Sequence, residues 1–138
     1  MSVVVMFSPD VFGRVALSYG ATEAARREER LVVVNPTKGD SYVDTKYAGD
    51  DELASLRSIL DRLDVESEIL HDVVPDIAGA VLHAASTTGA SLIVVGIRPR
   101  TPVGKLLLGS VAQRLILDAE CPVLAVKPDG SENLLAGT

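Results

Sequence analysis

The sequence predicts an α/β domain in which an open, five-stranded parallel sheet carries helices on both faces. Short apolar runs of strand length alternate with segments of helical periodicity in the order βαβαβαβαβ, and this alternation is typical of parallel strands joined by right-handed crossovers. The length of 138 residues suits one domain with its own hydrophobic core. A hydrophobic content of 47% with 4% aromatic residues indicates that small aliphatic side chains pack the helices against the sheet.

The first strand and the first helix are expected at residues 3–7 and 11–27. "VVVMF" is an apolar run of strand length, and the apolar residues after it recur at helical spacing. Between the two elements, Ser8 is expected to cap the helix, with Pro9 as its first residue and Asp10 in its first turn, near the positive end of the helix dipole.

The second and third strands are expected at residues 31–34 and 65–70, with an amphipathic helix over 51–63 between them. "VESEIL" alternates apolar and polar residues, which places the third strand nearer the edge of the sheet. Residues 36–50 are polar, lack a period and are long for a connection in a compact domain. This loop is therefore either a mobile flap or a variable insertion.

The remaining chain is expected to form helices at residues 76–89 and 109–119, strands at residues 91–96 and 121–128, and a tail at residues 129–138. Asp76 is expected to cap the third helix and Gly89 to end it. The fourth strand, "SLIVVG", is apolar throughout, so we expect it to be central and covered on both faces. The tail "DGSENLLAGT" is expected to be flexible, which gives a domain over residues 1–128.

The distribution of charge favours a small anionic ligand. A net charge of −6 argues against non-specific nucleic-acid binding. None of the 19 acidic residues lies between Asp76 and Asp118. The same interval contains four basic residues, Arg98, Arg100, Lys105 and Arg114. Alternatively, the acid-free interval arises by chance together with a buried strand and helix that exclude all charged residues.

Composition also predicts the compartment. The longest apolar runs fall far short of the roughly 20 residues that cross a bilayer, and no basic region precedes an apolar segment at the N-terminus. The single cysteine, Cys121, allows no intrachain disulfide and suits a reducing compartment. We therefore expect a cytoplasmic protein that has no association with membranes.

The chain carries elements of an anion site where its first and fourth strands end. Ligands of such folds lie beyond the carboxyl ends of the strands, where the strand order reverses. Gly96 ends its strand without a side chain, and Gly109-Ser110 begins a helix with free backbone N–H groups and a hydroxyl. Arg98 adds a charge in the loop between them. Taken singly, Gly109 is as readily a tight turn and Ser110 an ordinary N-cap.

The run from "SLIVVG" through "LLLGSVAQRLILDAECPVLAVK" resembles the C-terminal half of the universal stress protein family. The signature of that family is Gly, two residues, Gly, nine residues, then Gly-Ser or Gly-Thr. Gly96, Gly109 and Ser110 match it with the same spacing, and the five-strand order extends the resemblance over essentially the whole chain.

The resemblance implies a Rossmann-like fold of the adenine nucleotide alpha-hydrolase type and a regulatory role in the stress response. One branch of the family binds ATP, with magnesium as its companion ion. The implied binding positions in this chain are Ser8, Val34, Gly96, Arg98, Pro99, Gly109, Ser110 and Val111. A second branch lacks the signature and works as a dimeric interaction module without nucleotide.

Two departures weaken the expected ATP site. Pro99 stands where the signature has its second glycine and supplies no N–H. The loss of one charge-assisted hydrogen bond costs about 1.5–3 kcal/mol, or roughly 10- to 100-fold in affinity. Ser8 stands where the family has Asp, so it brings no charge to a ribose or a metal. These departures favour the interaction module, whereas Gly109-Ser110 and the basic loop favour nucleotide binding; another small anion is a third alternative.

No group of residues predicts an enzyme, beyond slow ATP hydrolysis. A triad of Ser8, His71 and Asp72 lacks a nucleophile elbow. The acidic residues after the first strand are too few for a phosphoacceptor domain. No Cys or His grouping has the spacing of a metal site. His83 is expected at the surface, and Cys121 as a small buried hydrophobe.

The last strand predicts an interface. It is apolar, and no helix follows to cover it, so an exposed edge would require a partner. The resemblance implies a homodimer through this strand, with contacts from Pro122, Val123, Leu124, Ala125 and Val126. Alternatively, the strand closes the sheet internally. Partners beyond the second copy are expected to be proteins.

Overall fold

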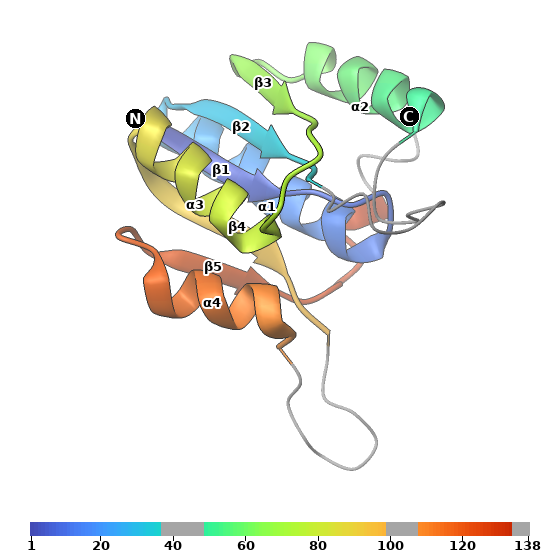
Figure 1. Ribbon diagram of the computed structural model, residues 1–138. Helices are drawn as coiled ribbons and strands as arrows, with labels where there is room; N and C mark the ends of the chain where they lie inside the picture. Colours follow the sequence, from blue (N-terminus) through green and yellow to red (C-terminus); the bar gives the residue numbers. More distant parts are fainter. Residues whose placement is uncertain (37–48, 99–107, 134–138) are drawn as a thin grey trace.

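The computed structural model describes residues 1–36, 49–98 and 108–133 and confirms the expected fold class. Its elements are β1 (Ser2–Met6), α1 (Val11–Arg27), β2 (Arg30–Val34), α2 (Asp50–Arg62), β3 (Ser67–Leu70), α3 (Ile77–Thr88), β4 (Ala90–Gly96), α4 (Ser110–Asp118) and β5 (Val123–Val126). All strands pair in parallel in the order β3-β2-β1-β4-β5, as Figure 1 shows. In the described part of the chain, no helix is long and apolar enough to cross a membrane.

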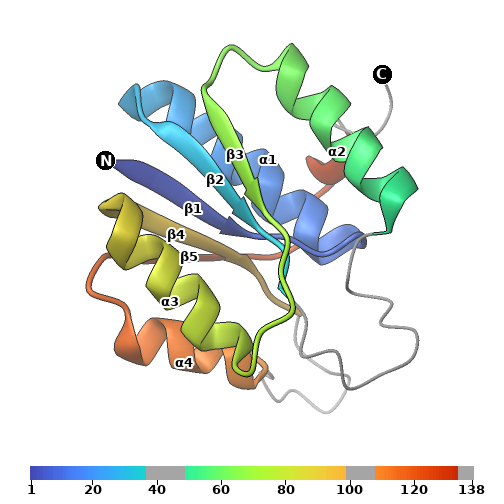
Figure 2. The same ribbon diagram turned by 45° about the horizontal axis from the view of Figure 1, so that its top comes forward.

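The four helices form two layers, one on each face of the sheet. Helices α1 and α2 pack on one face and α3 and α4 on the other (Figure 2). Successive residues of β1 point to opposite faces, so Val3 and Val5 join the core beneath α1 and α2, and Val4 joins the core beneath α3 and α4. All three are fully buried. This two-sided burial explains the continuous apolar runs of the central strands.

The order of the strands matches two expectations about position. β3 lies at one edge of the sheet, where its alternating sequence predicted it. β4 lies between β1 and β5 and is buried from Leu92 to Val95, as its continuous apolar run predicted.

The helix ends follow the predicted chemistry at one position and differ at two. Gly89 ends α3 with a φ of 64°, a left-handed conformation that glycine adopts at little cost. Asp76 stands at the start of α3, but its carboxylate accepts no capping hydrogen bond; it pairs with Arg114 of α4 instead. The expectation that Ser8 caps α1 is wrong, because Asp10 is the N-cap and helix α1 begins at Val11.

The chain continues beyond β5 into an ordered turn. The carboxylate of Glu132 accepts hydrogen bonds from the backbone N–H groups of Asp129 and Gly130, at 3.3 Å and 2.9 Å. Asp129 also accepts a hydrogen bond from the Tyr19 hydroxyl of α1. Residues 129–133 of the expected tail therefore pack on the domain, and the remaining five residues lie outside the described part of the chain. The boundary at residue 128 stays a prediction.

Candidate functional site

The carboxyl ends of β1 and β4 form the point where the strand order reverses. From β1 the chain crosses to β2 and β3 on one side, and later returns to place β4 on the other side. In open α/β sheets the crevice at such a point is where ligands bind. Three predicted site positions mark it: Ser8 follows β1, Gly96 ends β4 and Ser110 begins α4. Pro99, Arg100 and Lys105 lie outside the described residues.

The loop between β1 and α1 is held by its own side chains. The Ser8 hydroxyl donates a hydrogen bond of 2.7 Å to Oδ1 of Asp10, which also accepts the Gly13 N–H at 3.0 Å. A Cβ on Gly13 would lie 1.9 Å from the carbonyl oxygen of Ser8, so only glycine lets the loop pack against α1 here. The Asp10 carboxylate is thus engaged as the helix cap, and Ser8 retains lone pairs that can accept a hydrogen bond.

The end of β2 is joined to the end of β1 by a residue that the sequence did not single out. Asn35 is 1% exposed and donates from Nδ2 to the Phe7 carbonyl at 2.7 Å. Beside it, the Val34 carbonyl accepts the Phe7 N–H at 2.8 Å, and the Val34 residue is 3% exposed. At the carboxyl end of β2, Val34 therefore has a carbonyl that is already bonded and a side chain that lies in the core.

Gly96 is required for packing between β4 and α1. A Cβ at this position would lie 2.3 Å from the backbone oxygen of Phe12, in the first turn of α1. The space that a side chain at Gly96 would occupy is thus filled by α1, and a contact of Gly96 with a ligand stays a prediction. Arg98, two residues on, is exposed, and its guanidinium lies 5.7 Å from the centre of the Phe12 ring. This cation–π contact holds a positive charge beside the start of α1.

The start of α4 has the properties of an anion site. Gly109 has a φ of 85°, and a Cβ there would meet no atom of the described residues within 4 Å. Among the described residues no side chain caps the helix, and the N–H groups of a first helical turn have no intrahelical partner and lie at the positive end of the dipole. Ser110 is exposed, whereas Val111 is partly buried against the core beneath α3 and α4.

Arg114 does not belong to this anion site. Its guanidinium pairs with Asp76 of α3 and with Asp118 one turn along α4, the latter at 3.5 Å. These carboxylates, Asp76 first, raise the pKa of Arg114 and neutralise its charge locally. Of the four basic residues in the acid-free interval, the structure describes Arg98 and Arg114. Between these two, Arg98 has no carboxylate partner among the described residues.

The other residues considered from the sequence are the candidate metal ligands, His83 and Cys121. Across the described ranges, no three His, Cys, Asp or Glu residues are grouped so that they could hold a metal ion. His83 is exposed on α3, as expected. Cys121 is only partly buried, and this burial raises the pKa of its thiol.

Comparison with known proteins decides the family. The model of the universal stress protein family matches residues 1–127. The chain belongs to this family. A universal stress protein of Mycolicibacterium smegmatis is 48% identical over 128 residues, which cover 93% of this chain and 98% of the relative.

Solved structures of universal stress proteins share the fold. One from Archaeoglobus fulgidus superposes with a TM-score of 0.76 at 30% identity, covering 92% of this chain and 98% of its own. A second, from the same organism and in complex with dAMP, gives a TM-score of 0.66 at 24% identity. A universal stress protein in complex with cAMP gives 0.65 at 24% identity and 93% coverage of this chain. The five-stranded sheet is therefore the Rossmann-like fold of universal stress proteins.

Proposed function

We propose that this universal stress protein is a cytoplasmic regulatory protein that binds an adenine nucleotide at the switch point of its sheet. The observation that carries the proposal is the start of α4, where an uncapped helix N-terminus follows a glycine with open space around it. Backbone N–H groups in this arrangement suit a phosphate. Two proteins of the same fold that bind dAMP and cAMP support an adenine nucleotide as the ligand class.

Each described residue has a role that follows from its position. Gly109, Ser110 and Val111 would present N–H groups to the phosphate, and Ser110 would add a hydroxyl. Arg98 would contribute a positive charge from the other wall of the crevice. Ser8 would accept a hydrogen bond from the ribose, and the end of β2 at Val34 would border the base.

The site offers fewer groups to bind magnesium than to bind a phosphate. Asp10 is the carboxylate nearest in sequence to the end of β1, and it already accepts hydrogen bonds from Ser8 and Gly13. AMP carries one phosphate, which the N–H groups of α4 and Arg98 would bind. It lacks the two further phosphates of ATP, whose charge a magnesium ion would balance. We therefore expect AMP to bind at least as well as ATP with magnesium, with nucleotide acting as a regulatory ligand rather than as a substrate.

The alternative function is an interaction module that works without nucleotide. Ser8 favours it, because its hydroxyl is turned to Asp10. Pro99 favours it as well, because it supplies no N–H at the second glycine position of the signature. Titration with nucleotide separates the two functions.

The test is calorimetric titration with AMP and with ATP plus magnesium, using protein freed of nucleotide carried through purification. Binding at about micromolar strength is expected for the unaltered protein. Gly109→Asp is expected to weaken it at least about 10-fold more than Gly109→Asn. The two variants impose the same backbone strain and differ only in the charge placed beside the phosphate. Absence of binding up to millimolar nucleotide, with the protein folded, would leave the interaction module or a site for another small anion as the function.

A further inference from the structure

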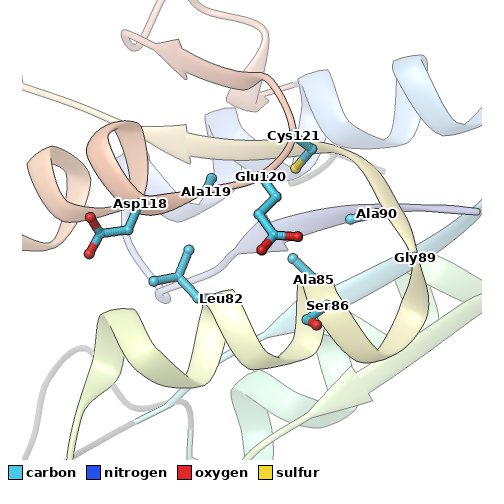
Figure 3. A pocket seen from close by; sticks show the side chains of 9 residues that line it. All are labelled: Leu82, Ala85, Ser86, Gly89, Ala90, Asp118, Ala119, Glu120 and Cys121. Atoms are coloured by element: carbon cyan, nitrogen blue, oxygen red, sulfur yellow. The ribbon is translucent and has the colours of Figure 1, made fainter.

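A cavity lies at the opposite end of the sheet from the switch point. It has a volume of about 300 Å³ and is formed by α3, the start of β4 and the turn between α4 and β5. Its lining residues are Leu82, Ala85, Ser86, Gly89, Ala90, Asp118, Ala119, Glu120 and Cys121, drawn in Figure 3. This volume is at the lower limit of pockets that hold small organic ligands.

The lining divides into an apolar wall and an acidic rim. Leu82, Ala85, Ala90 and Ala119 supply methyl and methylene groups. Two carboxylates line the same cavity, those of Asp118 and Glu120, and no basic side chain is among the lining residues. Figure 3 shows the Glu120 carboxylate extending from the α4–β5 turn towards α3, above Ala85. A ligand here meets apolar surface and negative charge together.

The backbone adds to the negative potential. Helix α3 ends at Thr88 and α4 ends at Asp118, so the C-termini of both helices border this cavity. Carbonyl groups of the last turn carry the negative end of the helix dipole. Neither helix has a basic residue in its last turn to offset it.

The two carboxylates are not equivalent. Asp118 shares the guanidinium of Arg114, at 3.5 Å. For Glu120, none of the described residues supplies a cation that would pair with it. Glu120 is therefore the charge that a ligand would neutralise.

We propose that this cavity binds a small organic cation, an ammonium group carried on a short apolar chain. The chain would lie against Leu82, Ala85 and Ala90, and the ammonium would donate hydrogen bonds to the Glu120 carboxylate and to carbonyl groups at the end of α4. An ammonium group has three donors and no acceptor, which matches a rim made of acceptors alone. The site is independent of the nucleotide crevice, so either can bind its ligand without the other.

The test is an NMR titration of the full chain with n-hexylammonium, with n-hexanol and hexanoate as probes of equal chain length. Saturable shifts of the backbone amides of Gly89, Ala119 and Glu120 are expected with n-hexylammonium. Hexanol is expected to bind at least about 10-fold more weakly and hexanoate not to bind. Equal affinity for hexanol, or shifts that do not saturate, would overturn the proposal.

Variants separate the cavity from the acidic surface in general. Glu120→Gln is expected to weaken n-hexylammonium binding about 3- to 10-fold, whereas Glu66→Gln, at an exposed position before β3, is expected to leave it unchanged. Ser86→Leu places a larger side chain in the cavity from an exposed position on α3 and is expected to abolish binding. Equal effects of the two Glu→Gln variants would show that the cation binds to the surface charge alone.

Discussion

Two glycines of the family signature serve different purposes in this chain. Gly109 has open space where a Cβ would be, and its φ of 85° requires a residue without one. Gly96 has the backbone of α1 in that position, 2.3 Å from an ideal Cβ. Gly109 thus shapes the start of α4, whereas Gly96 lets α1 approach the end of β4.

This difference predicts a loss of stability at Gly96. Gly96→Ala is expected to lower the free energy of unfolding by about 1–3 kcal/mol, because the contact is with backbone and cannot be relieved by a side-chain rotation. Urea denaturation measures the change. Gly79→Ala in α3 is the control, since the nearest atom to its Cβ is a side-chain carboxylate oxygen of Asp76 rather than backbone and alanine favours a helix. A Gly96→Ala protein as stable as the control variant would contradict the packing role.

Single residues also show why the sequence predicted part of the site and missed the rest. Ser8 and Asp10 are both capping residue types, so composition alone does not decide which one starts α1; the hydrogen bond of 3.0 Å from Gly13 to Asp10 does. Asn35 bonds to Phe7, 28 positions away, and Asp76 neutralises Arg114 across 38 positions. Such contacts depend on which elements become neighbours, and periodicity carries no information about them.

At the scale of elements, the strands and helices were predictable because each has a strong local signal. The predicted span of α1 agrees with the observed Val11–Arg27, and Gly89 ends α3 as expected. The turn after β5 was the exception. Gly, Ser, Asp and Asn dominate its sequence and predict a flexible tail, yet residues 129–133 are held by Glu132 and by the hydrogen bond from Tyr19 to Asp129.

The contact between α1 and this turn predicts a pH dependence. The hydrogen bond from Tyr19, followed by hydrogen bonding from Ser131, lowers the pKa of Asp129 from 3.8 to about 2. A carboxyl group whose pKa is lower in the folded state stabilises the fold above its unfolded pKa. The contribution of Asp129 is therefore complete above about pH 4 and is lost as the pH falls towards 2.

Tyr19→Phe tests this assignment. Removal of the hydroxyl is expected to raise the pKa of Asp129 back towards 3.8, because the largest cause of its depression is gone. A carbon-13 NMR titration of the side-chain carboxyl groups measures the pKa directly. A value that stays near 2 in the variant would mean that hydrogen bonds within the turn, rather than the contact with α1, set the acidity of Asp129.

At the scale of the whole molecule, the two ends of the sheet carry different potentials. Helix N-termini gather at the carboxyl end, around the crevice proposed for a nucleotide phosphate. Helix C-termini and two carboxylates gather at the amino end, around the cavity proposed for an organic cation. Both polarities follow from the parallel βα order, because every crossover helix runs antiparallel to its strands. The sequence predicts this polarity once the element order is known, but the cavity depends on side-chain packing that the order does not define.

The two edges of the sheet also differ, and we propose that β5 pairs with its counterpart in a second copy. β5 is an edge strand, which agrees with the expectation of an unpaired last strand. Val126, predicted as part of the interface, packs in the core of its own chain, and we therefore exclude its side chain from the contact. The carbonyl groups of Pro122 and Val126 accept hydrogen bonds from the N–H groups of Ile93 in β4 and of Ile97, the residue after β4. By the alternation of a parallel ladder, the backbone groups of Val123 and Ala125 face the free edge.

This geometry makes Ala125→Pro a selective test of the dimer. The N–H that proline removes faces the free edge, so pairing with β4 is expected to survive while pairing with a second copy is lost. Ser67→Pro is the matched control. The carbonyl groups of Glu66, just before β3, and of Leu70 accept hydrogen bonds from Leu31 of β2 and from Asn35, the residue after β2. The same alternation therefore turns the N–H of Ser67 to the opposite free edge.

Sedimentation velocity at about 50 µM protein is expected to show a dimer for the unaltered chain and for Ser67→Pro, and a monomer for Ala125→Pro. Thermal unfolding verifies that each variant is folded. An unaltered chain that sediments as a monomer would refute the proposed pairing. If Ser67→Pro alone dissociated, the interface would lie on β3 instead. Dissociation of Ala125→Pro alone would assign the self-complementary surface to β5, and an isologous contact there would join two sheets of five strands into one continuous sheet.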